Sequence, residues 1–167
     1  YKRQIPKDPW LLAYGASDAL VAKLIPAARE INDYMPLHVA DLTVDGLREA
    51  HVEIEEARVA VLGYAYLENS DDTRNSPSVT LINRLEELGA EVLVHDPWVH
   101  GYQAELETVV QDCDAIVVMV AHDAYRALAL EALRAQVAHP VLVDGRHVFS
   151  SAEARAAGWV YRGVGIG

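Results

Sequence analysis

The sequence contains a single cysteine, Cys113. One cysteine excludes an internal disulfide and any metal site built from several thiolates, and it is typical of a protein from a reducing compartment. Because Cys113 enters the apolar run 115–120, we predict a buried, unreactive thiol. The seven histidines do not have the spacing of metal ligands, so we expect no metal site.

Long hydrophobic runs and basic clusters are also missing. No apolar run approaches the ~20 residues that a membrane-spanning helix needs, and no signal-peptide pattern is present. Lysine and arginine total 14 against 25 aspartates and glutamates, which gives a net charge of −11. Because nucleic-acid phosphates would repel such a chain, we expect no nucleic-acid partner. Because a membrane-spanning run and a signal peptide are missing, we expect a cytoplasmic protein that does not bind a membrane.

The sequence has no initiating methionine and opens on a loop-like segment with Pro6 and Pro9. We therefore expect it to be part of a longer protein. Its 167 residues, 51% of them hydrophobic, are still enough to bury the core of one domain of ordinary size.

The first part of the chain has helical periodicity. Apolar residues recur at three- and four-residue spacing over 17–35, after a possible cap at Ser17. Pro26 predicts a kink or a break into two helices, and Pro36 predicts a second interruption. Residues 17–48 offer more apolar surface than one sheet domain needs, which favours a helical arm that joins two subunits. The alternative is a helix that packs on its own sheet.

From residue 58 onward, short apolar runs alternate with helical patterns. Continuous apolar strands separated by helices indicate a parallel sheet with helices on both faces. We therefore predict an α/β, Rossmann-like fold, with a helical domain end over 1–52 and a sheet domain over 53–167. The predicted strands are 59–64, 91–96, 115–120, 141–145 and 159–164, and the predicted helices are 77–88, 104–110, 128–137 and 151–157.

The first turn of this sheet lacks the glycines of a dinucleotide-binding loop. The first strand ends at Gly63, but the positions two and five residues later hold Ala65 and Glu68. In a parallel sheet, ligands bind beyond the carboxyl ends of the strands, where the following loops converge. These loops would gather the following residues at one edge: Tyr64, Tyr66, Arg74, Asp96, Trp98, His122, Asp123, Asp144 and Arg146.

Two arginines in these loops have competing interpretations. The guanidinium of Arg146 is suited to bind a phosphate or carboxylate through two hydrogen bonds, or else to pair with Asp144 or Asp96 and hold the loops together. The segment 71–76, which contains Arg74, is either part of a site or a polar loop in which Ser76 caps the helix that starts at Pro77. The residues alone leave both alternatives open.

Six segments of the sequence, in order, carry a resemblance to a known family. They are IPKDPWLL, AREINDYMPLHVADL, the stretch from VAVLGYAYLENS to VHDPWV, CDAIVVMVAHDAY, VLVDGRHVF and GWVYRGVGIG. Together they resemble the UDP-glucose/GDP-mannose dehydrogenase family, and the last is more similar to the branch that acts on UDP-N-acetylhexosamines, such as UDP-N-acetylmannosamine. The resemblance implies an enzyme that oxidises C6 of a sugar nucleotide twice with two NAD, through a cysteine nucleophile. It also implies that NAD binds a separate N-terminal domain and that two subunits pack through the long helix.

The resemblance implies roles for five residues. Tyr64 and Tyr66 fall where the family places pocket aromatics, Arg74 falls in its DTR signature, and Arg146 falls in its DGR. Asp8 falls on the acid thought to help activate water. The first turn of the sheet would then serve the sugar nucleotide rather than NAD.

Four positions depart from the family pattern. Gln4 stands at the catalytic cysteine position, Tyr1 and Lys2 replace the paired glycines before it, and Leu67 replaces a lysine that contacts substrate in many members. We therefore predict the substrate-binding, dimerising part of an NAD-dependent UDP-sugar 6-dehydrogenase, inactive by itself. The alternative is a non-catalytic nucleotide-sugar-binding or regulatory domain. A phosphoacceptor signalling domain is disfavoured, because no aspartate ends the third strand.

Overall fold

The computed structural model describes residues 8–15 and 19–166, except for the side chains of residues 8, 15 and 19–22. The predicted helix cap at Ser17 and the substituted catalytic position Gln4 lie outside the described residues. The chain forms two compact units, Tyr1–Met35 and Pro36–Gly167.

Helix α1 (Asp8–Gly15) is followed by helix α2 (Ala19–Glu49), which is continuous through both of its prolines. Of the two outcomes predicted at Pro26, a kink or a break, the break is therefore wrong, and so is the predicted interruption at Pro36. A proline removes one backbone hydrogen bond, but the other bonds of a long helix remain. Pro36 is also buried and precedes Val39 and Ala40, which pack in the core, so packing outweighs the lost bond.

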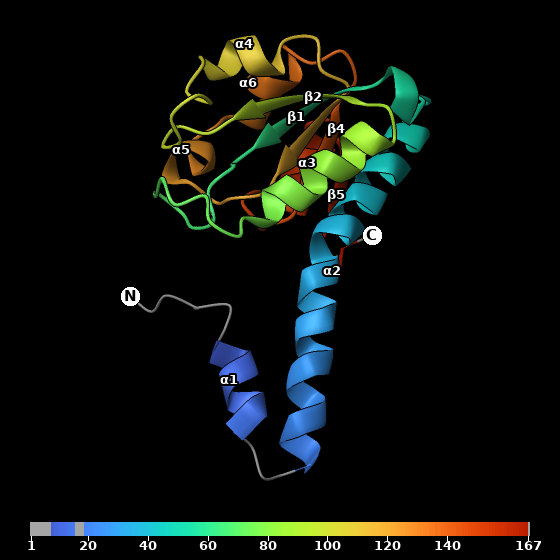
Figure 1. Cartoon of the computed structure of the whole chain (residues 1–167). Helices are drawn as coiled ribbons and strands as arrows, with labels where there is room; N and C mark the ends of the chain where they lie inside the picture. The colour runs from blue at the N-terminus through green and yellow to red at the C-terminus, as the bar shows by residue number, and fades with distance from the viewer. Residues whose placement is uncertain (1–7, 16–18, 167) are drawn as a thin grey trace. The chain divides into compact units, whose positions relative to one another are not determined.

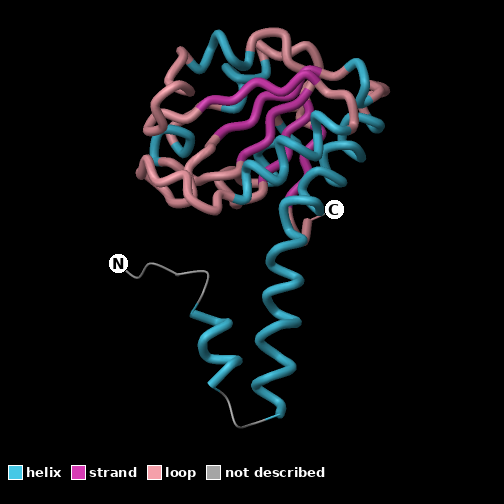
Figure 2. Tube along the Cα trace, viewed as in Figure 1, coloured by secondary structure: helices cyan, strands magenta, loops and turns pink. Residues whose placement is uncertain are grey.

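The second unit is built on a five-stranded sheet in the order β2-β1-β3-β4-β5, with every neighbouring pair parallel (Figures 1 and 2). Each predicted strand is present and ends one or two residues earlier than predicted, while the first begins one residue earlier and the fifth begins one residue later. Each run is apolar on both faces because helices cover both sides of the sheet. The strands are β1 (Arg58–Leu62), β2 (Glu91–His95), β3 (Ala115–Val118), β4 (Val141–Asp144) and β5 (Val160–Gly163).

The connecting helices confirm the alternating pattern and add two short elements. A one-turn helix follows β3 where we predicted a loop, and a 3-10 turn, η1, spans Ile54–Glu56. Elements of one turn are too short to show an apolar period. The helices are α3 (Pro77–Glu87), α4 (Leu106–Val110), α5 (Asp123–Arg126), α6 (Leu130–Arg134) and α7 (Ser151–Ala156).

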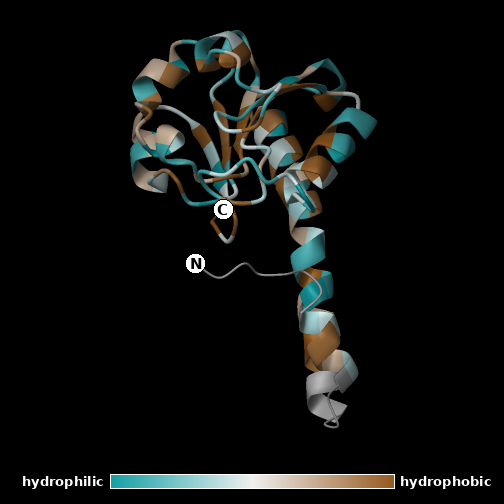
Figure 3. Cartoon of the chain, turned by 60° about the vertical axis from the view of Figure 1, so that its left-hand side comes forward, coloured by the Kyte–Doolittle hydropathy of each residue, from teal (hydrophilic) through white to brown (hydrophobic). Residues whose placement is uncertain are grey.

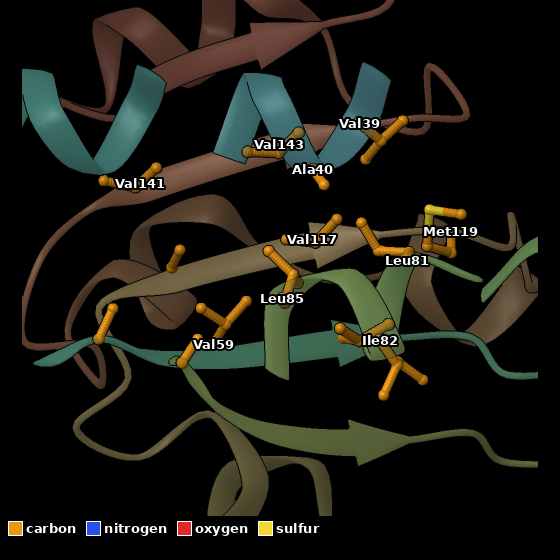
Figure 4. Close-up of a cluster of buried hydrophobic side chains, with 14 of the residues drawn as sticks. Val39, Ala40, Val59, Leu81, Ile82, Leu85, Val117, Met119, Val141 and Val143 are labelled. Carbon is orange, nitrogen blue, oxygen red and sulfur yellow. The ribbon is translucent and has the colours of Figure 1, made fainter. Parts of the chain in front are cut away.

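Two apolar clusters cover the two faces of the sheet. On one face, Val39 and Ala40 of α2 and Leu81 and Leu85 of α3 lie over the strands, as Figure 4 shows. On the other face, side chains of α4 to α7 cover the strands. Figure 3 shows the strands as the apolar interior. The predicted α/β, Rossmann-like fold with helices on both faces is confirmed.

Cys113 is fully buried beside this second cluster, as predicted. Burial raises the pKa of its thiol to about 11, so the thiol stays protonated at neutral pH and is a poor nucleophile.

The compact sheet unit starts at Pro36, because residues of α2 such as Val39 and Leu47 belong to its core. The boundary between residues 52 and 53, as a division between domains of the full-length protein, stays a prediction. Among the helices that the structure describes, none is sufficiently long and apolar to span a membrane.

Candidate functional site at the carboxyl ends of the strands

The loop after β1 leaves the sheet through Gly63, which has a φ of +99°. A Cβ atom added to this glycine would lie 2.5 Å from Cβ and 2.7 Å from the backbone nitrogen of Val120, after β3. The loop therefore passes so close to the neighbouring strand end that only glycine fits. This requirement, rather than pyrophosphate binding, accounts for the glycine at the end of the first strand.

Asp96, the residue after β2, is fully buried and joins the loops that follow three strands. Burial alone would raise the pKa of its carboxyl, but hydrogen bonds from His122 and from loop N–H groups hold this pKa well below its usual range. Oδ2 accepts hydrogen bonds from the backbone nitrogens of Tyr64 (2.7 Å) and Ala65 (2.9 Å) and lies 3.1 Å from Nε2 of His122, while Oδ1 accepts from the backbone nitrogens of Trp98 (2.8 Å) and Val99 (3.1 Å).

These contacts test whether the sheet edge fits a dinucleotide. In a dinucleotide-binding domain, an acidic residue about 20 positions after the glycine-rich turn binds a ribose hydroxyl. Here Asp96 has protein donors on both carboxylate oxygens and is 0% exposed. The glycine positions also hold Ala65 and Glu68. This edge of the sheet therefore does not fit NAD.

His122 extends the contacts of Asp96 to the far part of the same loop. The ring is fully buried, and its Nδ1 accepts a hydrogen bond from the backbone nitrogen of Asn69 at 2.9 Å. An Nδ1 that accepts carries no proton, so Nε2 carries it and donates to Asp96. The Asn69 side chain in turn bonds to Asp123 at the start of α5, at 2.9 Å and 3.1 Å.

Two tyrosines lie together beside this loop. The rings of Tyr64 and Tyr102 have centroids 4.6 Å apart, and the backbone carbonyl of Tyr102 accepts the Asp96 N–H at 2.8 Å. Burial, followed by the neighbouring Tyr64, raises the pKa of Tyr102. Tyr102 is not among the residues that we predicted at this edge. Tyr66 is half-buried, and its backbone nitrogen donates to the carbonyl of Asp72 at 2.7 Å.

Arg74 is bound within its own loop. Its Nε lies 2.8 Å from Oδ1 of Asp72, and its Nη2 lies 2.6 Å from Oδ2. The Arg74 side chain is 85% exposed, and the hydrogen bond and charge of Asp72 raise its pKa. The predicted cap is confirmed, since Oγ of Ser76 accepts the Ser78 N–H at the start of α3. The segment therefore caps a helix and still presents a guanidinium to solvent.

Arg146 is exposed in the loop after β4. Among the described residues, no ion pair joins its guanidinium to Asp144 or Asp96, whereas its backbone nitrogen donates to Oδ1 of Asp144 at 3.0 Å. The other oxygen of the buried Asp144 accepts from the Phe149 nitrogen at 2.8 Å and lies 3.4 Å from the Tyr161 hydroxyl. Burial and Asp144 raise the pKa of Tyr161 to about 12, so this hydroxyl stays a donor.

The predicted site residues fall on two loops of the same edge. Tyr64, Tyr66 and Arg74 belong to the loop after β1, Arg146 belongs to the loop after β4, and β3 lies between these strands. Asp8 begins α1 in the other compact unit, and its role stays a prediction.

The sheet unit has two surface cavities, one of them bordered by the loops after β2 and β3. One of about 400 Å³ borders His95 and Tyr125, one of about 420 Å³ borders Trp159 and Arg162, and neither is lined by a predicted site residue. Within the part of the chain that the structure describes, no three His, Cys, Asp or Glu side chains form a group able to hold a metal ion.

The fold and this edge define a Rossmann-like domain whose first turn is not built for a dinucleotide. Residues 60–151 match the UDP binding domain of the UDP-glucose/GDP-mannose dehydrogenase family. The chain belongs to this family, as the ordered segments of its sequence predicted.

Individual relatives match almost the whole chain. A UDP-N-acetyl-D-mannosamine dehydrogenase of Pyrococcus horikoshii is 36% identical over 98% of this chain and 38% of its own length. A UDP-glucose 6-dehydrogenase of Bacillus subtilis is 32% identical over 96% of this chain and 36% of its own length. The solved structure of a UDP-D-ManNAc dehydrogenase from Pyrococcus horikoshii has a TM-score of 0.86 at 33% identity, covering 99% of this chain and 38% of that one. The chain thus spans somewhat more than a third of the length of these relatives.

Proposed function

We propose that the carboxyl edge of the sheet binds the UDP portion of a nucleotide sugar, as part of an NAD-dependent UDP-sugar 6-dehydrogenase that forms a UDP-uronic acid. The family's UDP binding domain covers this edge, from β1 to the start of α7. The 36% identity to a UDP-N-acetyl-D-mannosamine dehydrogenase favours a UDP-N-acetylhexosamine as the sugar nucleotide.

The observation that carries this proposal is the state of Arg146. Its guanidinium is exposed, it has no ion-pair partner among the described residues, and Asp144 fixes its backbone. A guanidinium in that setting is available for two charge-assisted hydrogen bonds to a diphosphate. Arg74 adds a second positive charge, and Tyr64 and Tyr66 offer aromatic surface to the uracil.

The carboxyl edge of the sheet does not fit NAD, so we assign the cofactor to another part of the full-length protein, where it would supply the hydride acceptor for the oxidation. On this chain, the resemblance assigns to Asp8 the activation of water, and Asp8 begins helix α1. Leu67, which stands where many members have a lysine, is 45% exposed.

A second candidate function is a nucleotide-sugar-binding or regulatory domain without oxidation chemistry. Gln4 at the catalytic cysteine position favours it. The remaining cysteine does not replace the nucleophile, because Cys113 is buried, has a raised pKa and precedes β3 at the opposite edge of the sheet.

We also propose that the protein is a homodimer. Several large apolar side chains of α1 and of the first part of α2 are half or more exposed, although helices of soluble proteins bury such surface against a partner. A second copy of the same chain is the partner that the resemblance implies. The exposed residues are Trp10, Leu11, Leu12 and Tyr14 of α1 and Leu24, Ile31 and Tyr34 of α2.

A location in the cytoplasm stays a prediction.

The test of the proposed function is calorimetric titration of this chain with UDP, a UDP-N-acetylhexosamine and NAD in parallel. We expect saturable binding of the two uridine ligands and no heat from NAD. Binding of NAD without binding of UDP would contradict the proposal, because the edge would then serve the cofactor. Binding of UDP alone would keep the nucleotide site and remove the sugar assignment.

A further inference from the structure

The loops at the carboxyl edge share one buried point of attachment. The Asp96 carboxylate is bonded to the loop after β1 through Tyr64 and Ala65, to its own loop through Trp98 and Val99, and to His122 after β3. The backbone nitrogen of Asp96 also bonds to the carbonyl of Tyr102. The two tyrosines that face each other are therefore attached to the same residue.

His122 adds a second attachment on the same loop. Asn69 bonds to Nδ1 of His122, and its left-handed backbone, with a φ of +53°, points the N–H toward the ring. The loop after β1 is thereby bound at its start, through Tyr64, and at its middle, through Asn69. Three of the residues proposed to contact the nucleotide sugar, Tyr64, Tyr66 and Arg74, lie on this loop.

We infer that Asp96 and His122 act together as positioning residues. They hold the loop after β1 in the conformation that binds the nucleotide sugar, and neither side chain contacts the nucleotide sugar itself. Both side chains are 0% exposed, so neither contacts a ligand. A dinucleotide site has glycines and a ribose-binding acid at these places. Here the hydrogen bonds of Asp96 and His122 hold the loop after β1 instead. This inference rests on the proposed function for its ligand, but not for its geometry.

The opposite edge of the sheet provides a matched control. Asp114, before β3, accepts a hydrogen bond from the Arg58 nitrogen at 2.7 Å and lies 2.8 Å from Nδ1 of His139. This pair has the same chemistry, aspartate with histidine and a backbone N–H. It lies at the amino ends of the strands, away from the loops of the proposed site.

The experiment compares His122→Leu and His122→Gln with His139→Leu. Leucine removes both hydrogen bonds of the ring, whereas glutamine offers one acceptor and one donor in similar places. Each variant is titrated with UDP at a temperature well below its melting midpoint, and amide hydrogen exchange is measured for Tyr64, Ala65 and Asn69. If His122→Leu does not fold, Asp96→Asn takes its place.

We expect His122→Leu to weaken UDP binding by at least about tenfold, because bonds to a buried charge are lost. His122→Gln should recover most of that loss, and His139→Leu should bind as the unchanged protein does while its melting temperature falls. Equal affinity in folded His122→Leu, or an equal loss in His139→Leu, would overturn the inference.

Hydrogen exchange separates this inference from the proposed function. If the unchanged protein does not bind UDP, the function proposal fails, and the exchange rates still test the positioning. Faster exchange at Tyr64, Ala65 and Asn69 in His122→Leu, but not in His139→Leu, supports the inference. Unchanged exchange at these amides overturns it.

Discussion

Arg74 and Asp72 form an ion pair with two hydrogen bonds across two residues of the same loop, at 2.8 Å and 2.6 Å. The backbone nitrogen of Arg74 also donates to Oδ1 of Asp72 at 3.1 Å. Because the Arg74 side chain is 85% exposed, water and salt weaken this pair. We therefore expect the pair to orient the guanidinium and to give way to a diphosphate.

Replacing Arg74 should separate binding from stability. We expect Arg74→Ala to weaken UDP binding by about tenfold, because a charge-assisted contact is lost, and to leave the free energy of unfolding almost unchanged, because the pair is exposed. Calorimetry and urea denaturation measure the two effects. Arg84→Ala, which removes an exposed pair with Glu87 on α3, is the control and should leave UDP affinity unchanged. Equal affinity in both variants would remove Arg74 from the site.

Replacing Arg146 tests the second arginine. We expect Arg146→Ala to weaken UDP binding by about 1–3 kcal/mol. The UDP affinity of Arg146→Lys should lie between those of the unchanged protein and Arg146→Ala, because an ammonium keeps the charge but not the forked geometry. Uridine, which has no phosphate, should bind the unchanged protein and Arg146→Ala alike. Arg134→Ala is the control. The Nε of Arg134 lies 3.4 Å from the carbonyl of Gly158, before β5. A variant that loses uridine and UDP equally would place Arg146 away from the diphosphate.

A methyl group at Gly63 should be poorly tolerated. We expect Gly63→Ala to lower the free energy of unfolding by about 2 kcal/mol or more, because the new Cβ would meet Val120 at 2.5–2.8 Å and φ is +99°. Gly101→Ala isolates the effect of backbone conformation, since its φ is +97° and nothing lies within 4 Å of the added Cβ. Urea denaturation of both variants gives the comparison. Similar losses would mean that the close approach to Val120 contributes little.

The buried carboxylate predicts a dependence of stability on acid. The pKa of Asp96 is lower in the folded chain than the ordinary value of about 3.9, so the unfolded chain takes up this proton first as the pH falls. Ionised Asp96 therefore stabilises the fold above about pH 4, and this contribution is lost as the pH falls further.

Urea denaturation between about pH 6 and pH 3 measures this loss. We expect the free energy of unfolding to fall more steeply in the unchanged protein than in Asp96→Asn, which has no proton to take up at this position. Asp71→Asn, at an exposed loop position, should follow the unchanged protein. Parallel curves for all three proteins would mean that Asp96 is not ionised in the fold.

The exposed apolar side chains of α2 predict an effect on assembly. Leu24 is 70% exposed and Ile31 is 66% exposed. We expect Leu24→Glu combined with Ile31→Glu to convert a dimer into a monomer, because a buried unpaired carboxylate at an apolar interface is strongly unfavourable. Light scattering over a concentration series gives the mass, and Glu30→Lys is the control for a change of charge alone. A monomeric mass for the unchanged chain would contradict the dimer proposal.

The sequence alone determined the fold class and the family. Runs that are apolar at every position, such as 115–120, are stable as strands only when both faces of the sheet are covered, and this condition dictates a parallel α/β arrangement. The absence of glycine at positions 65 and 68 already indicated that the first turn is not a dinucleotide-binding loop. Local chemistry also located the cap at Ser76, because the hydroxyl and the N–H that it caps are two residues apart.

Tertiary structure decided what depends on residues far apart in the chain. Helix α2 continues through Pro36 because core packing compensates for the lost hydrogen bond, and no local pattern contains that packing. The sequence placed Asp96 at the binding edge as one polar residue among several. Its carboxylate is instead buried beneath the loops. The Tyr64 nitrogen and Nε2 of His122 reach it only because the fold places the strands side by side. A residue's type and spacing predict where it lies along a strand, but the direction of its hydrogen bonds is set by neighbours that the fold alone brings together.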